Sequence, residues 1–128
     1  MIRVKRVYDP HEPDDGPRFL VDRLWPRGMK KENLAMDGWL KDAAPSDALR
    51  HWFGHDPARW EEFCRRYATE LEANADAWRI LVTLALKQDI TLLYSAHDIE
   101  HNNAAALRSF IEKRLAGASL AVAANKSF

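Results

Sequence analysis

Four side chains able to bind a metal or move a proton lie in one short polar segment: His97, Asp98, Glu100 and His101. Imidazole and carboxylate groups suit zinc or manganese, but this spacing matches no established metal motif, so no metal is predicted. A histidine oriented by a carboxylate is a common acid or base, and Asp98 and His101 are therefore the candidate catalytic pair. The alternative is that both side chains satisfy backbone groups of the loop.

A second candidate group lies at a turn in the first quarter of the chain. Arg23 and Arg27 bracket this turn, and two guanidinium groups could hold a phosphate or carboxylate while Trp25 stacks on a base or sugar. The alternative is that Arg23 pairs with Asp22 or another acid and that Trp25 packs in the core. His55 and Asn102 complete the candidate binding residues, although a helix cap is the first role expected of Asn102.

A buried strand must position the polar segment. Residues 90–94 form an apolar and β-branched run without alternation, which is typical of a strand covered on both faces in a parallel sheet. A helix then follows, capped by Asn102 or Asn103, with apolar residues at helical spacing. We predict that this strand is interior to a small, mostly parallel sheet, pairs with the N-terminal strand and is flanked on both faces by helices. Ligands commonly bind beyond the carboxyl ends of such strands, and a helix N-terminus there favours anions.

Local patterns predict the other elements. Residues 2–8 alternate as a half-buried or edge strand, and residues 18–24 are strand-like with Phe19 and Val21 facing away from Leu20. The intervening residues 9–17, with three prolines and four acids, are expected to form an exposed loop. A turn of helix at residues 30–34 and a short extended segment before Pro45 come next.

Three helices are predicted between that segment and the buried strand, two of them from capping residues. Ser46 should begin a short helix that stops at Gly54, and the pair Asp56-Pro57 should begin the next one. Residues 75–87 are apolar nearly all round, so this helix is expected to be central. After Leu115 no convincing period remains, and we predict one compact α/β domain over residues 1–115. Residues 116–128 are then a tail that is either disordered or docked by Leu120, Val122 and Phe128.

Composition limits the class of protein. A chain of 128 residues with 47% hydrophobic residues supports one well-buried core, and its formal net charge of zero provides no overall attraction to nucleic acid or anionic lipid. The single cysteine, Cys64, excludes an intrachain disulfide and is expected to be a buried, inert residue of a helix face. No signal peptide or membrane-spanning apolar run is present, so we expect a cytoplasmic protein without a membrane partner.

Several ordered motifs resemble one known family. These are residues 21–28 (Val-Asp-Arg-Leu-Trp-Pro-Arg-Gly), 49–57, 59–63, and 92–94 together with 98–102. Over residues 1 to about 115 they are similar to the YeaO-like family, a bacterial domain of unknown function, which implies a compact α/β domain and no particular activity. A distant branch of the same superfamily carries a cysteine on the last strand and Cys-His-Arg at the helix start. Tyr94 and Asn102-Asn103-Ala104 stand at those positions here, which speaks against thiol chemistry.

Two functional hypotheses remain open. The first is a small cytoplasmic enzyme or ligand-binding domain for an anionic molecule, phosphorylated or nucleotide-like, in which Arg23 and Arg27 hold charge and Asp98 or His101 transfers a proton. The second is a non-catalytic module that binds nucleic acid or protein through the basic first quarter. The first requires Arg23, Trp25, Arg27, Asp98 and His101 to line one anion-accepting pocket, and the second requires a spread basic surface. The sequence contains no common nucleotide-binding or hydrolase motif, so no cofactor is predicted. The sequence does not predict the oligomeric state.

Overall fold

The computed structural model describes the backbone of residues 1–126 and the side chains of residues 1–117. It contains four strands and four α-helices, with single 3₁₀ turns between several of them. In chain order they are β1 (Ile2–Arg6), β2 (Arg18–Leu20), β3 (Gly38–Trp39), α1 (Asp47–Phe53), α2 (Trp60–Glu72), α3 (Arg79–Ala85), β4 (Ile90–Tyr94) and α4 (Asn103–Lys126).

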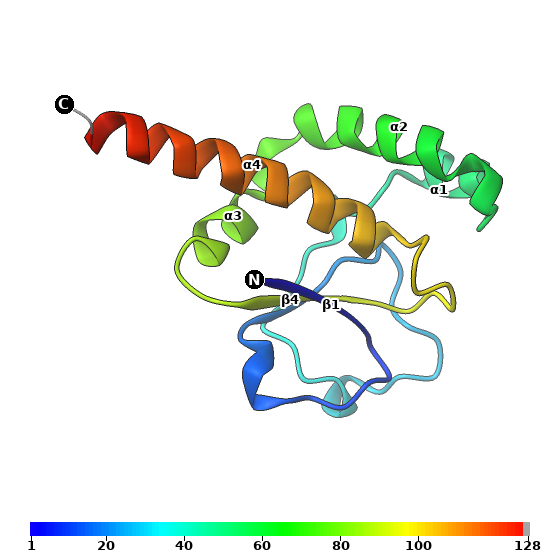
Figure 1. The fold of residues 1–128 in the computed structure, drawn as a ribbon. Helices are drawn as coiled ribbons and strands as arrows, with labels where there is room; N and C mark the ends of the chain where they lie inside the picture. The colour runs from blue at the N-terminus through cyan, green and yellow to red at the C-terminus, as the bar shows by residue number, and fades with distance from the viewer. Residues whose placement is uncertain (127–128) are drawn as a thin grey trace.

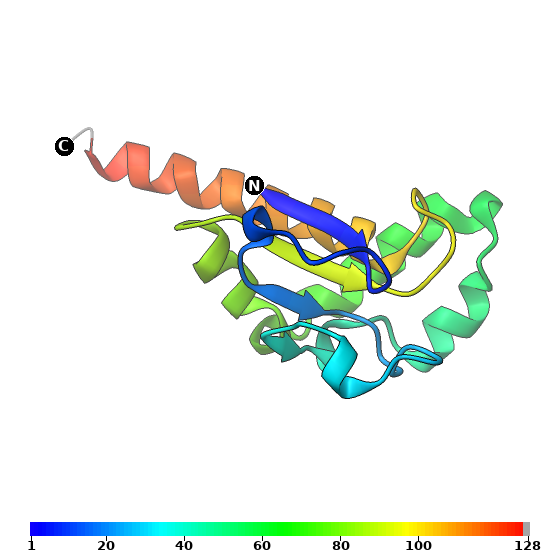
Figure 2. The ribbon, with the colours of Figure 1, turned by 90° about the horizontal axis from the view of Figure 1, so that it is seen from below.

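The four strands form one sheet in the order β1-β4-β2-β3, and every neighbouring pair is parallel (Figures 1 and 2). β4 is interior, with Val4 of β1 opposite Leu92 and Phe19 of β2 also opposite Leu92. All five β4 residues are buried, as expected for a strand covered on both faces. The predicted α/β fold, the interior position of this strand and its pairing with the N-terminal strand are confirmed.

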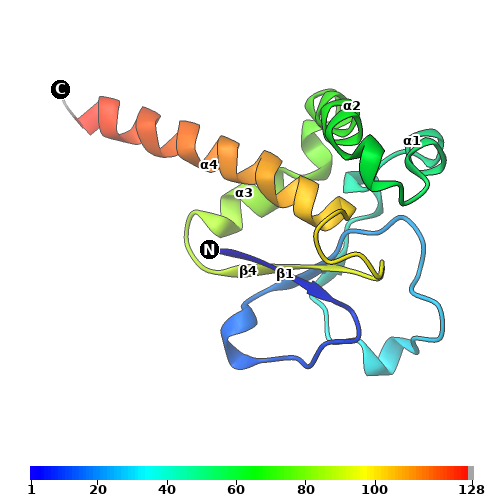
Figure 3. The same ribbon diagram turned by 45° about the vertical axis from the view of Figure 1, so that its right-hand side comes forward.

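The two faces of the sheet are covered differently. The four α-helices all lie on one face, where Phe19, Val21 and Leu92 join the main core (Figures 1 and 3). On the other face, Leu20 and Leu93 pack against residues from the segment between β2 and β3: Trp25, Met29, Leu34 and Met36. Phe19 and Val21 thus face away from Leu20, as predicted. The prediction of helices on both faces is wrong, because this connecting segment forms only a 3₁₀ turn at Lys31–Asn33.

Helix ends follow the capping residues. The Ser46 hydroxyl accepts a hydrogen bond from the Leu49 N–H (3.1 Å), and Gly54 ends α1 in the left-handed conformation. Asp56 caps the 3₁₀ turn that leads into α2 by accepting from the Ala58 N–H. Asn102 Oδ1 accepts from the Ala105 N–H (2.8 Å), which makes Asn102 the cap of α4. These predicted helix starts and the predicted stop are confirmed.

α3 is peripheral, which contradicts the prediction of a central helix. Only Leu81 of this helix is fully buried, whereas Ile80 is 46% exposed and Leu86, just beyond it, is 54% exposed. The predicted range divides into a 3₁₀ turn at Ala75–Ala77 and the seven residues of α3. A helix this short can turn only one side toward the sheet, so its other apolar residues meet solvent.

The acidic loop between β1 and β2 is only partly the exposed segment that was predicted. Residues 8–14 are exposed, but Asp15 is buried and forms ion pairs with Arg18 (2.6 Å) and Lys5 (3.1 Å). Gly16 follows with a φ of 62°, and a Cβ there would lie 2.0 Å from the Asp89 carbonyl oxygen. The backbone of the loop at Gly16 therefore lies directly against the backbone at Asp89, just before β4.

The last helix continues past the predicted end near Leu115, since α4 runs to Lys126. Whether Leu120, Val122 or Phe128 docks lies outside the described side chains. Cys64 is half-buried on α2, and burial raises the pKa of its thiol, with Lys113 acting in the opposite direction. None of the helices in residues 1–126 is both long and apolar enough to cross a membrane.

Candidate functional site

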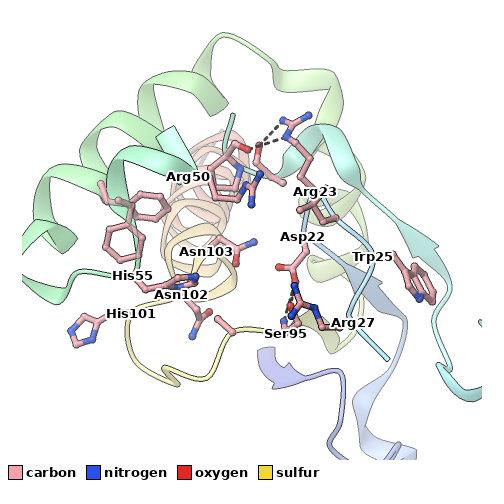
Figure 4. Close-up of a pocket in the computed structure, with 16 residues that line it drawn as sticks. Asp22, Arg23, Trp25, Arg27, Arg50, His55, Ser95, His101, Asn102 and Asn103 are labelled. Atoms are coloured by element: carbon pink, nitrogen blue, oxygen red, sulfur yellow. Dashed lines mark hydrogen bonds between the residues drawn. The ribbon is translucent and has the colours of Figure 1, made fainter. Parts of the chain in front are cut away.

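A cavity of about 390 Å³ lies beyond the carboxyl ends of β2 and β4, the edge of the sheet where α/β proteins usually bind ligands. Its wall comes from the loop after β2, the Ala44-Pro45 segment, α1 with the turn after it, the loop after β4 and the start of α4 (Figure 4). The charged or hydrogen-bonding side chains in this wall are Asp22, Arg23, Trp25, Arg27, Arg50, His55, Ser95, His101, Asn102 and Asn103.

The candidate residues from the sequence largely share this cavity. Arg23, Trp25, Arg27, His55, His101 and Asn102 all line it, although they come from segments far apart in the chain. Asp98 does not line the cavity, but it contacts His101, which does. The arrangement therefore brings the predicted binding residues together and leaves one of the two predicted catalytic residues outside.

Arg23 is engaged by the protein itself. Its Nε donates to the Pro45 carbonyl oxygen (3.1 Å) and its Nη2 to the Ala44 carbonyl oxygen (3.3 Å), as Figure 4 shows. The guanidinium thus holds the segment before α1 in place, and the suggested pairing with Asp22 does not occur. Arg23 serves mainly to shape the cavity wall.

Arg27 and Arg50 have donors to spare. Arg27 is exposed, and among the side chains that the structure describes, residues 1–117, its guanidinium has no hydrogen-bond or ion-pair partner. Arg50 bonds Asp47 through Nη2 (3.1 Å), but its Nε is buried and has no partner among the described residues. A buried donor without a partner costs about 1–3 kcal/mol, so the protein itself leaves the guanidinium of Arg50 incompletely satisfied.

Asp22 places a carboxylate among these guanidinium groups. Its Oδ2 accepts from the Ser95 N–H (3.0 Å) and from the Ser95 hydroxyl (2.8 Å), which ties the ends of β2 and β4 together. Burial raises the pKa of Asp22, although the hydrogen bonds from Ser95 and Asn103 and the charge of Arg50 act against that rise.

Trp25 contributes little to the cavity. Its Nε1 donates to the Met29 carbonyl oxygen (2.6 Å), and its ring meets Trp39 edge-on with centroids 5.3 Å apart. Figure 4 shows the indole turned away from the other labelled side chains. The sequence alternative, that Trp25 packs against the core, describes its position better than stacking on a ligand does.

Asp98 and His101 do form a bonded pair. His101 Nδ1 lies 2.9 Å from Asp98 Oδ2, and Asp98 Oδ1 accepts from the N–H groups of Glu100 and His101, both at 2.9 Å. These backbone bonds, that of His101 foremost, hold the pKa of Asp98 below its usual range. The His101 ring also packs edge-on against Trp60. Asp98 therefore contacts the imidazole and also satisfies the loop backbone. A catalytic role of the pair stays a prediction.

Two further candidate residues, His55 and Asn102, line the cavity because each lies at the end of a helix. His55 follows Gly54 with a φ of 56° and lies near Phe53, so it contacts the end of α1. Asn102 caps α4, while its Nδ2 donates to the Asp98 carbonyl oxygen (3.0 Å). In the part of the chain that the structure describes, no three His, Cys, Asp or Glu side chains are placed to hold a metal ion.

Sequence reasoning missed Asp22, Arg50, Ser95 and Asn103. Asp22 and Ser95 directly follow buried strands, so the strand-end rule that selected Arg23 and His97 would have selected them as well. Asn103 is expected from the sequence first as a helix cap, whereas in the structure its Nδ2 donates to the Val21 carbonyl oxygen (2.8 Å). Arg50 has no comparable signal, because its position depends on how α1 packs beside the sheet.

Comparisons with known proteins place these features in a family context. The family model described as the inactive DUF488-N3 subclade matches residues 1–127. The uncharacterized protein YeaO of Escherichia coli (strain K12) is 44% identical over 110 residues, which cover 86% of this chain and 96% of YeaO. An uncharacterized protein of Mycobacterium tuberculosis (strain ATCC 25618 / H37Rv) is 40% identical over 113 residues, covering 88% and 95% of the two chains. No solved structure matches the chain significantly.

Proposed function

The chain belongs to the YeaO-like family of unknown function, within the DUF488-N3 subclade, and from its geometry we propose that it binds an anionic small molecule, phosphorylated or nucleotide-like, in the cavity beyond β2 and β4. The observation that carries this proposal is the pair Arg27 and Arg50. Both guanidinium groups line the cavity and both keep donors without protein partners. Guanidinium groups match the geometry of phosphate and carboxylate oxygens and stay charged at any physiological pH.

The start of α4 supports an anion at the same place. Asn102 caps only one of the first N–H groups of this helix, and the positive end of the helix dipole lies beside the cavity (Figure 4). The guanidinium groups of Arg23, Arg27 and Arg50 outnumber the single carboxylate of Asp22 in the wall. The cavity is therefore positively charged overall, which favours an anionic ligand.

Binding without catalysis is the primary proposal. The subclade is described as inactive, and Asp98, one of the two predicted catalytic residues, lies outside the cavity wall. An enzyme is the second candidate, favoured by the 2.9 Å contact between Asp98 and His101, because an imidazole oriented in this way can act as a base through Nε2. His101→Gln separates the two, since it should leave anion binding intact and remove only a proton-transfer activity.

The nucleic-acid alternative has less support. Five of the basic side chains in the first quarter are engaged by the protein itself. Arg3 pairs with Asp89, Lys5 and Arg18 pair with Asp15, Arg6 bonds the carbonyl oxygens of Ser95 and Ala96, and Arg23 bonds those of Ala44 and Pro45. A nucleic-acid surface needs basic groups free to contact phosphates. The engaged residues leave too few exposed cations in this region for a continuous basic surface.

The proposal is tested by thermal unfolding with and without sulfate, inorganic phosphate, pyrophosphate and adenosine monophosphate. A ligand that binds only the native state stabilises it by RT ln(1 + [L]/Kd), about 2.7 kcal/mol at a hundredfold excess over Kd. We expect at least one of these anions to raise the Tm of the wild type. Arg27→Ala and Arg50→Ala should abolish most of this rise, because each removes a guanidinium with free donors.

Arg79→Ala is the matched control. Arg79 is an exposed arginine of α3 that pairs with Asp76 and lies outside the cavity, so its loss removes the same charge without touching the site. The control should respond to the anions as the wild type does. Equal responses from the wild type, Arg27→Ala, Arg50→Ala and Arg79→Ala would refute an anion site in this cavity.

A further inference from the structure

Asp22 is the one acidic side chain in a cavity that otherwise favours anions. We infer that the cavity selects anionic ligands that also carry a hydroxyl or amino group next to the anionic group, and that Asp22 accepts the hydrogen bond from this donor. The inference rests on the proposed function and narrows it to a class of ligand, such as the phosphate ester of a polyol or sugar.

The position of Asp22 is fixed by neutral groups. Its Oδ2 takes both hydrogen bonds from Ser95, and the preceding residue Val21 is completely buried in the main core. Figure 4 shows the carboxylate of Asp22 hydrogen-bonded to Ser95 at the cavity. A carboxylate anchored by these uncharged donors presents a preformed acceptor to whatever enters the cavity.

Asp22 is not accounted for by an ion pair. Three arginines line the same cavity, yet within residues 1–126 none of them forms an ion pair with Asp22, and Arg23 is directed instead to the carbonyl oxygens of Ala44 and Pro45. A structural carboxylate in this position would be expected to use the adjacent guanidinium groups, as Asp15 does with Arg18. Asp22 and the arginines are therefore available to the ligand separately.

A carboxylate beside a bound phosphate repels it unless the ligand also supplies a donor. A buried charge without a compensating partner is costly, and burial already raises the pKa of Asp22. A ligand with a hydroxyl or ammonium group close to its phosphate satisfies both parts of the site, because its anionic oxygens meet Arg27 and Arg50 while its donor meets Asp22. A site built to bond a donor discriminates strongly against an analogue that lacks one.

The experiment compares two phosphate monoesters with the same carbon skeleton, glycerol 1-phosphate and propyl phosphate, by isothermal titration calorimetry on the intact chain at pH 7.5. A hydrogen bond to a charged group contributes about 1.5–3 kcal/mol, or roughly tenfold to a hundredfold in affinity. We therefore expect glycerol 1-phosphate to bind the wild type at least about tenfold more tightly than propyl phosphate. Ethanolamine phosphate carries an ammonium group in place of a hydroxyl, and the same comparison with propyl phosphate tests whether Asp22 accepts a hydrogen bond from an amino group.

Asp22→Asn should remove most of this preference. The amide oxygen of the variant side chain can keep the Ser95 hydrogen bonds, which leaves the amide NH₂ where the second carboxylate oxygen was. That group donates rather than accepts and carries no negative charge. Propyl phosphate should then bind more tightly than it does to the wild type, and the advantage of glycerol 1-phosphate should fall to less than about threefold.

The outcomes separate the two proposals. If the two esters bind the wild type equally, and both depend on Arg27 and Arg50, the anion site stands and the role of Asp22 is refuted. If neither ester binds in a way that depends on these arginines, the anion site fails and the role of Asp22 fails with it. The comparison on the wild type needs no variant, so it decides the question even if Asp22→Asn does not fold.

Discussion

Two aspartates near the cavity show how the same side chain acquires opposite properties from its surroundings. Asp22 is half-buried, and burial raises its pKa despite the hydrogen bonds from Ser95. Asp98 is solvent-accessible, and the N–H groups of His101 and Glu100 lower its pKa. The carboxylate form is thus disfavoured at the first position and favoured at the second.

These shifts predict opposite pH dependences of stability. A raised pKa in the folded state means that protonated Asp22 stabilises the fold at low pH, and that this contribution is lost as the pH rises through the folded-state pKa. Asp22→Asn should therefore raise the free energy of unfolding at pH 7 relative to the wild type, and the gain should disappear as the pH falls below the ordinary aspartate range. Urea unfolding from pH 3 to 8 measures it.

Asp98→Asn serves as the opposing case in the same titration. Its lowered pKa means that the charged form stabilises the fold above the unfolded-state pKa and that this contribution is lost as the pH falls. The variant should therefore be less stable than the wild type at pH 7 and equal to it at the acidic end. Parallel pH profiles for the two variants would contradict the assignment of opposite shifts.

At the scale of elements, sequence patterns predicted the structure where local signals decide it. An apolar run without alternation predicted β4, which is buried throughout. Cap residues predicted the starts of α1 and α4, because a side-chain oxygen satisfies N–H groups within the same turn. The failures concern how elements are covered. An apolar helix predicted to be central is peripheral, and Trp25, Leu34 and Met36 cover one face of the sheet without any helical period.

The candidate site divides in the same way. Groups at strand ends, Arg23, Arg27 and His101, were predictable because a parallel sheet brings its carboxyl ends to one edge. The contribution of Arg50 was not, because it depends on the packing of α1 against α2 and the sheet. The orientation of Trp25 toward Trp39 was likewise decided by tertiary contacts on the opposite face.

A glycine at the junction of two elements gives a prediction at this scale. Gly16 has a φ of 62°, and an added Cβ would lie 2.0 Å from the Asp89 backbone oxygen just before β4. Gly16→Ala should lower the free energy of unfolding by more than about 3 kcal/mol, because left-handed strain of about 1–2 kcal/mol adds to a clash that backbone must relieve. Urea unfolding monitored by circular dichroism measures the loss.

Gly28→Ala is the control for strain alone. Gly28 also has a positive φ, 77°, but an added Cβ would meet nothing within 4 Å. Its substitution should cost only the conformational term, about 1–2 kcal/mol. Similar losses for the two variants would mean that the close approach between Gly16 and Asp89 does not constrain the fold.

For the molecule as a whole, a neutral net charge coexists with a locally positive cavity. The acids and bases of the first quarter largely pair with each other, as Asp15 does with Lys5 and Arg18, so their charges cancel near the far end of the sheet. The free guanidinium groups remain at the carboxyl ends of the strands. Paired charges at one end of the sheet and free guanidinium groups at the other let one small sheet provide both a stable core and a charged site.

The extent of the domain gives the last prediction. The buried residues described in α4 lie between Ala104 and Ile111, and Leu115 adds a half-buried contact to the core. Figure 1 shows the helix running on past the sheet. A chain stopped after Gly117 should therefore keep its free energy of unfolding within about 0.5 kcal/mol and its response to anions, because every core and cavity-lining residue that the structure describes is retained. A chain stopped after Ser109 loses Phe110 and Ile111 and should not fold cooperatively. Loss of the cooperative thermal transition in the longer truncation would show that residues 118–128 belong to the folded domain.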